Sequence, residues 1–220
     1  MKKILLVSLV MLLAVSVAFS QFGIKGGINL ATVGGADKKQ NDIDPTNRLC
    51  FVGGISCRIG LIAGISIQPE VMYIQKGAVY EVSQTIGGYT GTGKLTFKGD
   101  YIDIPLLLKF NLPIPVFSPY IEGGVSYGIL LSAKQKEEQS SNYPGDVSTS
   151  NETDIKDQMT KNDISWIVGV GFDLSILEID ARYVVGMKRL RKDIPETTTI
   201  DENATMIYNR GIILTVGLRF

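Results

Sequence analysis

The sequence has no histidine among its 220 residues and no surplus of either charge, with 22 Lys+Arg against 22 Asp+Glu. Nucleic-acid-binding domains carry a clustered basic surplus, so this balance argues against a nucleic-acid partner. The lack of histidine excludes zinc sites built on histidine ligands and nucleophile pairs that use histidine as the base. We therefore expect no catalytic residues, no metal site and no cofactor.

Cysteine is scarce, with Cys50 and Cys57 as the only two. They lie in one β-like run, and an extended strand would separate their Cα atoms by about 23 Å. A disulfide requires a Cα separation below about 7 Å. We expect two free thiols, with an intermolecular bond as the alternative.

Long apolar runs are missing after residue 20, where no segment reaches the roughly 18 residues of a transmembrane helix. The first twenty residues have a positive start at Met1–Lys3, an apolar run from Ile4 to Val17 and small residues at Ala18 and Ser20. This pattern predicts a signal peptide over 1–20, cleaved between Ser20 and Gln21. A membrane anchor is the alternative, but the run is short and a Gly-rich segment follows it. The mature domain, 21–220, then carries 20 Lys+Arg against 22 Asp+Glu, a formal charge of −2.

Apolar and polar residues alternate with a period of two in eight segments of the exported chain, which predicts an all-β fold. The strand cores are 22–31, 51–59, 65–75, 102–110, 121–131, 164–173, 179–188 and 211–220. Long polar connections alternate with short ones, and the long ones are Thr32–Asn47, Gly77–Lys94, Gln135–Asp163 and Leu190–Tyr208. An antiparallel up-and-down barrel would collect the four long loops at one end. Transmembrane barrels have this asymmetry, with short periplasmic turns and long extracellular loops.

The charged residues of these segments all fall on the face opposite the apolar one. They are Lys25, Arg58, Glu70, Asp103, Lys109, Glu122, Asp173, Asp180, Arg182, Lys188 and Arg219. Ten of the thirteen strand glycines share the charged face. Glycine has no evident use on a solvated strand face, whereas in a narrow barrel it makes room for long neighbouring side chains. We therefore predict an eight-stranded transmembrane barrel with its charges inside, and a soluble barrel or sandwich is the alternative.

Six of the inward charges are basic and five are acidic, which favours a salt-bridged plug in the lumen. A path for protons or small solutes is the alternative, although eight strands enclose little more than their own side chains. Pro69 and Pro105 lie inside two of the segments. Because proline removes a donor from a strand ladder, we expect bulges or a disturbed register there.

Several segments resemble the PorT-type outer-membrane β-barrel proteins that are common in Bacteroidetes. They are Phe22-Gly23-Ile24-Lys25-Gly26-Gly27-Ile28-Asn29-Leu30, Tyr101-Ile102-Asp103-Ile104-Pro105-Leu106-Leu107-Leu108-Lys109-Phe110, Pro119-Tyr120-Ile121-Glu122-Gly123-Gly124 and Gly217-Leu218-Arg219-Phe220. The resemblance covers the strands of 21–220 and none of the loops. It implies an outer-membrane barrel whose terminal Phe220 is read by the barrel-insertion machinery. For some members it also implies a part in type IX protein secretion.

Together these patterns predict a non-enzymatic outer-membrane barrel with a structural or interaction role. Its expected partners are membrane lipid, the insertion machinery, and envelope or secretion proteins that bind through 135–163 and 190–208. A narrow channel or a carrier of a small ligand is the alternative function. A membrane-embedded hydrolase is a third hypothesis, which the lack of histidine disfavours.

Overall fold

A computed structural model of the chain describes residues 20–35, 44–62, 64–86, 89–112, 114, 117–141, 148–190 and 207–220. Strand β1 (Ser20–Gly34) begins at the expected cleavage site, whereas residues 1–19 lie outside the described part. The signal peptide and its cleavage between Ser20 and Gln21 therefore stay predictions. No helix within the described ranges is long and apolar enough to cross a membrane.

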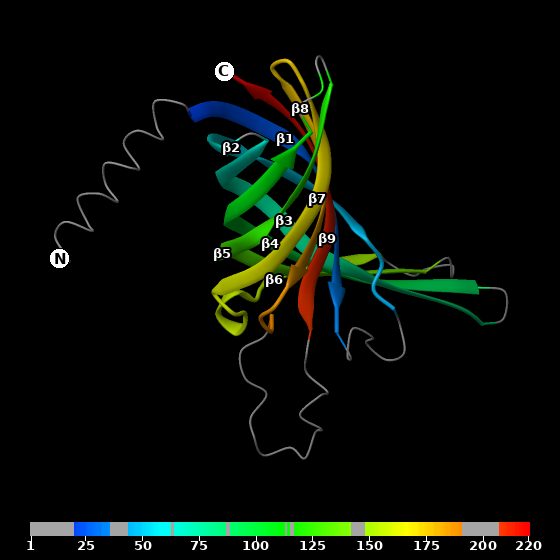
Figure 1. Ribbon diagram of the computed structural model, residues 1–220. Helices are drawn as coiled ribbons and strands as arrows, with labels where there is room; N and C mark the ends of the chain where they lie inside the picture. The colour runs from blue at the N-terminus through cyan, green and yellow to red at the C-terminus, as the bar shows by residue number, and fades with distance from the viewer. Residues whose placement is uncertain are drawn as a thin grey trace, which may run out of the picture.

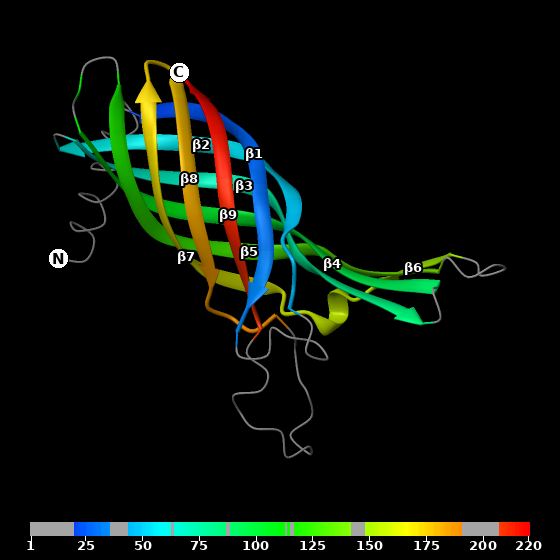
Figure 2. The ribbon, with the colours of Figure 1, turned by 90° about the vertical axis from the view of Figure 1, so that its right-hand side faces the viewer.

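Eight strands form a closed antiparallel ring (Figures 1 and 2), as the alternation predicted. After β1 they are β2 (Arg48–Ile62), β3 (Ile65–Ile86), β4 (Tyr89–Asn111), β5 (Ser118–Ser141), β7 (Asn162–Leu174), β8 (Leu177–Gly186) and β9 (Tyr208–Arg219). Neighbours in sequence pair with one another, and β9 pairs with β1 to close the ring. The short strand β6 (Thr149–Asp154) lies beyond the ring and pairs with the edge of β5 opposite the one that pairs with β4.

The two ends of the ring differ in their connections. The start of β1, the C-terminus and the short β2–β3, β4–β5 and β7–β8 connections lie at one end, which we call the turn end (Figure 2). The other end, the loop end, carries the β1–β2, β3–β4, β5–β7 and β8–β9 connections. This asymmetry agrees with the long and short connections in the sequence.

Burial alternates along the ring strands, because successive side chains of a strand point to opposite faces. In β9, for example, Ile213 and Thr215 are buried while Leu214 and Val216 are exposed. Most exposed residues of the ring are large and apolar, whereas many buried ones are charged or amide side chains. The ring is thus apolar outside and polar inside, the reverse of a soluble barrel.

Glycines let long side chains fit in this narrow interior. A Cβ atom on Gly171 would lie 2.5 Å from the Tyr120 hydroxyl, and one on Gly128 would lie 2.6 Å from Oδ1 of Asp103. Gly26, Gly53 and Gly123, the three glycines on the apolar parity, lie on the outer side of the ring.

The prolines do not produce the expected bulges. Pro69 pairs with Leu106 and Pro105 pairs with Ser126 without a change of register, although the β3–β4 ladder skips two positions between Pro69–Leu106 and Met72–Asp103. The register shifts instead between Gly60 and Ile62 and between Asp100 and Tyr101. The expectation of bulges was therefore wrong, but the ladder is interrupted beside both prolines, each of which lacks a backbone N–H donor.

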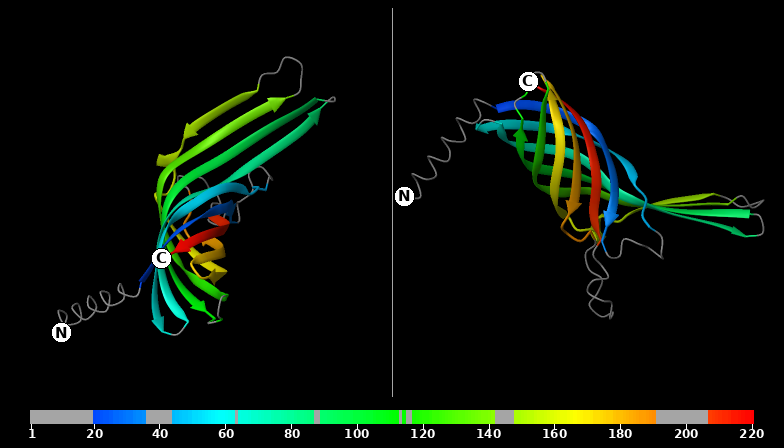
Figure 3. Two further views of the ribbon diagram at one scale, coloured as in Figure 1. Left: turned by 90° about the horizontal axis from the view of Figure 1, so that it is seen from above. Right: turned by 45° about the vertical axis from the view of Figure 1, so that its right-hand side comes forward.

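Two segments expected to be loops, Gly77–Lys94 and Gln135–Asp163, are largely strand. β3 and β4 continue as one hairpin to the pair Ile86–Tyr89, while β5 continues to Ser141 and pairs with β6. These parts form a four-stranded sheet that projects from the loop end (Figures 2 and 3). We call it the strand extension and define it as residues 77–86, 89–100, 132–141 and 149–154. Most of the other two long loops, residues 36–43 and 191–206, lies outside the described residues.

Candidate functional site in the barrel interior

Ten charged side chains meet inside the ring near the turn end, and every ring strand supplies at least one. We call them the turn-end cluster: Lys25, Arg58, Lys109, Arg182, Arg219, Glu70, Glu122, Asp173, Glu178 and Asp180. Five are basic and five are acidic. All are buried apart from Arg219, whose side chain is 13% exposed. The interior of this end is therefore filled by a cluster that is formally neutral.

Lys25 and Arg182 lie at the centre of the turn-end cluster. The Lys25 ammonium contacts Asp180 at 2.6 Å and Glu178 at 2.8 Å. The Arg182 guanidinium donates two hydrogen bonds to the Glu70 carboxylate, at 2.6 and 2.9 Å. Its Nε donates a third to Glu122 at 2.7 Å. This forked geometry satisfies both oxygens of Glu70, which is the arrangement that makes arginine–carboxylate pairs strong.

Glu178 links the remaining members. Its Oε1 accepts hydrogen bonds from Lys109 at 2.5 Å and from the Tyr120 hydroxyl at 3.2 Å, and its Oε2 accepts one from Arg58 at 3.0 Å. Arg58 also contacts Asp173 at 2.6 Å. The Lys109 ammonium lies 3.9 Å from the centre of the Tyr120 ring, close enough for a cation–π contact.

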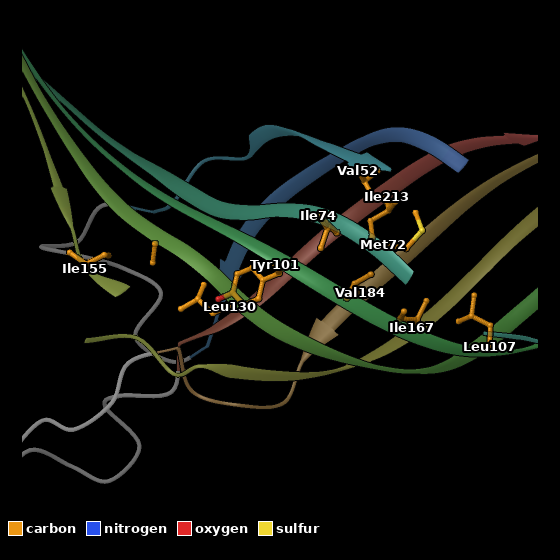
Figure 4. Close-up of a cluster of buried hydrophobic side chains, with 11 residues drawn as sticks. Val52, Met72, Ile74, Tyr101, Leu107, Leu130, Ile155, Ile167, Val184 and Ile213 are labelled. Atoms are coloured by element: carbon orange, nitrogen blue, oxygen red, sulfur yellow. The ribbon is translucent and has the colours of Figure 1, made fainter. Parts of the chain in front are cut away.

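A layer of apolar side chains follows the turn-end cluster along the interior. Val52, Met72, Leu107, Ile167, Val184 and Ile213, one each from six strands, belong to one buried cluster (Figure 4). Together with the turn-end cluster, this layer occupies the interior with side chains, as is typical of eight-stranded barrels.

A second polar group lies inside the ring on the loop-end side of the apolar layer. We call Lys76, Asp103 and Asp163 the loop-end triad. The Lys76 ammonium contacts Oδ2 of Asp103 at 2.9 Å and Oδ2 of Asp163 at 3.0 Å, and Asn209 donates a hydrogen bond to the latter oxygen. The Oδ1 atoms of both aspartates are buried and have no hydrogen-bond partner among the described residues. Two carboxylates thus share one ammonium, which leaves a formal charge of −1.

Of the eleven charged residues that were predicted to face the lumen, ten belong to these two groups. Nine belong to the turn-end cluster, and Asp103 belongs to the loop-end triad. Lys188 lies two residues beyond the end of β8, half-buried and outside both groups. The expected strands missed three inward charges by one residue each: Lys76 directly follows 65–75, Asp163 directly precedes 164–173, and Glu178 directly precedes 179–188. Each keeps the inward parity of its strand, so slightly longer segments would have included them.

The two cysteines lie on opposite faces of β2. Cys50 is buried on the inner face, Cys57 is half-buried on the outer face, and both are free thiols. The described residues contain no group of three or more side chains suited to a metal ion.

Outside the ring, the strand extension carries charged side chains on its outer face. Glu152 of β6 accepts hydrogen bonds from Lys134 at 2.8 Å and Lys98 at 3.0 Å, and Lys136 pairs with Glu138 at 2.6 Å. The hydrogen bond from Lys134, which has the larger effect, and the one from Lys98 lower the pKa of the Glu152 carboxyl group to about 2. These pairs are solvent-exposed, so each contributes little to stability on its own.

A closed antiparallel ring with an apolar outer surface and a charged interior defines a transmembrane β-barrel. The chain belongs to the outer membrane protein beta-barrel domain family, which it matches over residues 16–190. It is therefore a protein of the outer membrane, as the sequence predicted.

Several solved structures are similar to this chain at low sequence identity. Ail, the attachment invasion locus protein of Yersinia pestis, is 15% identical, with 91% of this chain and 99% of that chain covered and a TM-score of 0.41. Neisserial surface protein A is 13% identical, with 90% and 97% covered and a TM-score of 0.43. The translocator domain of the autotransporter NalP from Neisseria meningitidis is 11% identical, with 91% and 88% covered and a TM-score of 0.29. No curated protein sequence matches the chain significantly.

Proposed function

We propose that this protein is a non-enzymatic outer-membrane barrel with a closed lumen, which acts through contacts made at its loop end. The observation that carries the proposal is the turn-end cluster, in which five cations and five anions from all the ring strands neutralise one another. An ion or solute crossing the lumen would have to separate these pairs in a poorly hydrated space, and separating one buried pair is strongly unfavourable.

The apolar layer supports the same proposal. Met72, Leu107 and Ile213 are each less than a tenth exposed and offer no polar group to a hydrated ion. Hydrophobic constrictions block conduction by excluding water. Two successive barriers then block the lumen: the charged turn-end cluster and the apolar layer.

The strand extension supports an interaction role. It prolongs four strands beyond the ring, and its outer face presents lysines and carboxylates to solvent, among them Lys134, Lys136 and Glu152. Loops positioned by a rigid scaffold often carry binding functions. We assign partner binding to 135–163, which includes the ends of this extension, and to 190–208, most of which lies outside the described residues.

The finer assignment follows the resemblance of the strand segments to PorT-type proteins. We propose an accessory role in protein secretion of the type IX kind, with an envelope or secretion protein as the partner. On this proposal the leader 1–20 directs export, and the insertion machinery reads Phe220. The Phe220 ring is exposed at the turn end, and its backbone N–H donates a hydrogen bond to the carbonyl of Phe22 at 2.8 Å.

Conductance in planar lipid bilayers tests the closed lumen. The purified barrel should give no steady openings, while a variant with Arg182, Lys25 and Lys109 replaced by alanine should leak. Steady openings of the unaltered protein would favour the alternative function, a narrow channel or small-ligand carrier.

Affinity capture from native outer membranes tests the interaction role. A tagged protein should retain an envelope protein that a variant lacking 136–152 does not. Equal capture by both forms would place binding elsewhere, and turnover of lipid or peptide substrates by the pure protein would contradict a non-enzymatic role.

A further inference from the structure

We propose that the three short turns at the turn end of the barrel contact the lipid of the bilayer and not a soluble periplasmic partner. The turns expose large apolar side chains: Leu61, Ile62, Leu112, Ile114, Phe117 and Ile176. An exposed apolar patch of this kind marks an interaction surface. This inference depends on the outer-membrane location and is independent of the closed lumen and of the partner at the loop end.

The turns also carry no charge. Residues 59–69, 110–121 and 174–177 contain no Asp, Glu, Lys or Arg. At the loop end, by contrast, residues 133–141 alone contain two lysines and two glutamates. A segment that projects into water is usually polar, so the difference indicates that the two ends of the ring meet different surroundings.

The apolar side chains of the turns continue the lipid-facing surface of the strands. Leu61, the extra residue at the register shift near the end of β2, is exposed, as are Phe51 and Ile55 earlier on the same strand. Leu112 follows Leu108 and Phe110 on β4 in the same way. The surface that contacts lipid therefore runs past the strand ends without a polar break, and this continuity identifies lipid as the occupant.

The length of the apolar surface points to the same occupant. On β4 the outward-facing apolar residues run from Ile102, which is half-buried, to Phe110, which is exposed. Eight steps of about 3.3 Å, on a strand tilted by about 40°, span about 20 Å along the barrel axis. The apolar band of an outer-membrane barrel is about 25 Å tall. Leu112 adds about 5 Å by the same arithmetic and closes the difference.

Single-tryptophan variants in lipid nanodiscs, where both ends of the barrel are accessible, test the proposal. Trp166 is the only tryptophan, so the background is Trp166→Phe, and Leu61→Trp, Leu112→Trp or Ile176→Trp is added singly. Lys134→Trp, on the exposed strand extension, is the matched control. In phosphatidylcholine nanodiscs, brominated acyl chains should quench the three turn tryptophans several-fold more than the control. Acrylamide should quench them several-fold less.

Strong acrylamide quenching and red-shifted emission at the turns would overturn the proposal, because they would place these residues in water. Shielding found in native outer membranes but not in pure-lipid nanodiscs would also overturn it, because a protein would then cover the turns. Heat-modifiable gel migration verifies folding of each variant. If a tryptophan variant does not fold, Leu112→Cys in a Cys50→Ser, Cys57→Ser background replaces it. This thiol should resist a charged maleimide in nanodiscs and react after unfolding, whereas equal reaction in both states would contradict lipid contact.

Discussion

Arg182 is, with Lys25, one of two cations in the turn-end cluster that contact three carboxylates each. It is 3% exposed, and its guanidinium contacts three carboxylates, those of Glu70, Glu122 and Asp180. Removing its charge would leave these carboxylates with too few cations in a desolvated space. Buried ion pairs of this kind gain little over apolar packing when intact, yet breaking one is strongly unfavourable.

We therefore expect Arg182→Met to lower the free energy of unfolding by about 3–5 kcal/mol. The matched control is Lys136→Met, which removes an exposed pair with Glu138 and should change stability far less, because exposed ion pairs contribute little. Urea unfolding of the folded barrel in lipid vesicles measures both. Equal effects of the two substitutions would contradict a cluster that holds the ring together.

The loop-end triad makes an asymmetric prediction, because two carboxylates share the single ammonium of Lys76. Asp103→Asn leaves a balanced pair of Lys76 and Asp163, so its effect on the free energy of unfolding should be small. Lys76→Met leaves two buried carboxylates without a counter-charge and should be the more destabilising by about 2–3 kcal/mol. The same urea unfolding experiment ranks the two variants, and the reverse order would show that the triad is not limited by positive charge.

At the scale of the strand, the sequence predicted the ring strands, whose alternation is enforced by burial. It missed the strand extension, where burial enforces no alternation. The ring strands are recognisable in the sequence because one face contacts lipid and the other faces the lumen. This enforces an alternation with a period of two, in which residues such as Leu106 and Leu108 face outward. The strand extension has polar residues on its outer face, including Lys94 and Glu138, so no apolar periodicity marks it as strand. Parity placed most lumen charges on the inner face, but the partner of each charge depends on the stagger between strands, which the sequence does not display.

Within the strand extension, the packing of β6 against β4 and β5 should depend on pH through Glu152. Its pKa is lowered from 4.5 to about 2 by the hydrogen bonds from Lys134 and Lys98. A carboxyl group whose folded pKa is lowered contributes stability above its unfolded pKa and loses that contribution as the pH falls. Amide-exchange protection of residues 149–154 should thus be constant above about pH 4.5 and fall between pH 4.5 and 2. Glu152→Gln should lower protection at neutral pH and abolish most of this dependence. An unchanged profile in the variant would assign the effect to another group.

For the whole molecule, the ring and the strand extension are distinct units in structural terms. Within the ring, β4 and β5 are joined by pairs such as Leu107–Gly124 and Lys109–Glu122, and the interior is held by the turn-end cluster. The extension adds cross-strand pairs that lie beyond the ring. Barrel folding should therefore not require the extension, whereas partner binding should.

A truncated chain tests this separation, because both cuts can be made between residues that already pair across strands. Val79 pairs with Thr96, and Gln135 pairs with Thr153, so an Asn-Gly turn can replace residues 80–95 and a second can replace 136–152. We expect the truncated chain to show the same heat-modifiable migration as the full chain, because none of the turn-end cluster or the apolar layer is removed. It should also lose capture of the envelope partner. A truncated chain that fails to fold would show that the extension guides closure of the ring, and one that folds and still captures the partner would move the binding surface to 190–208.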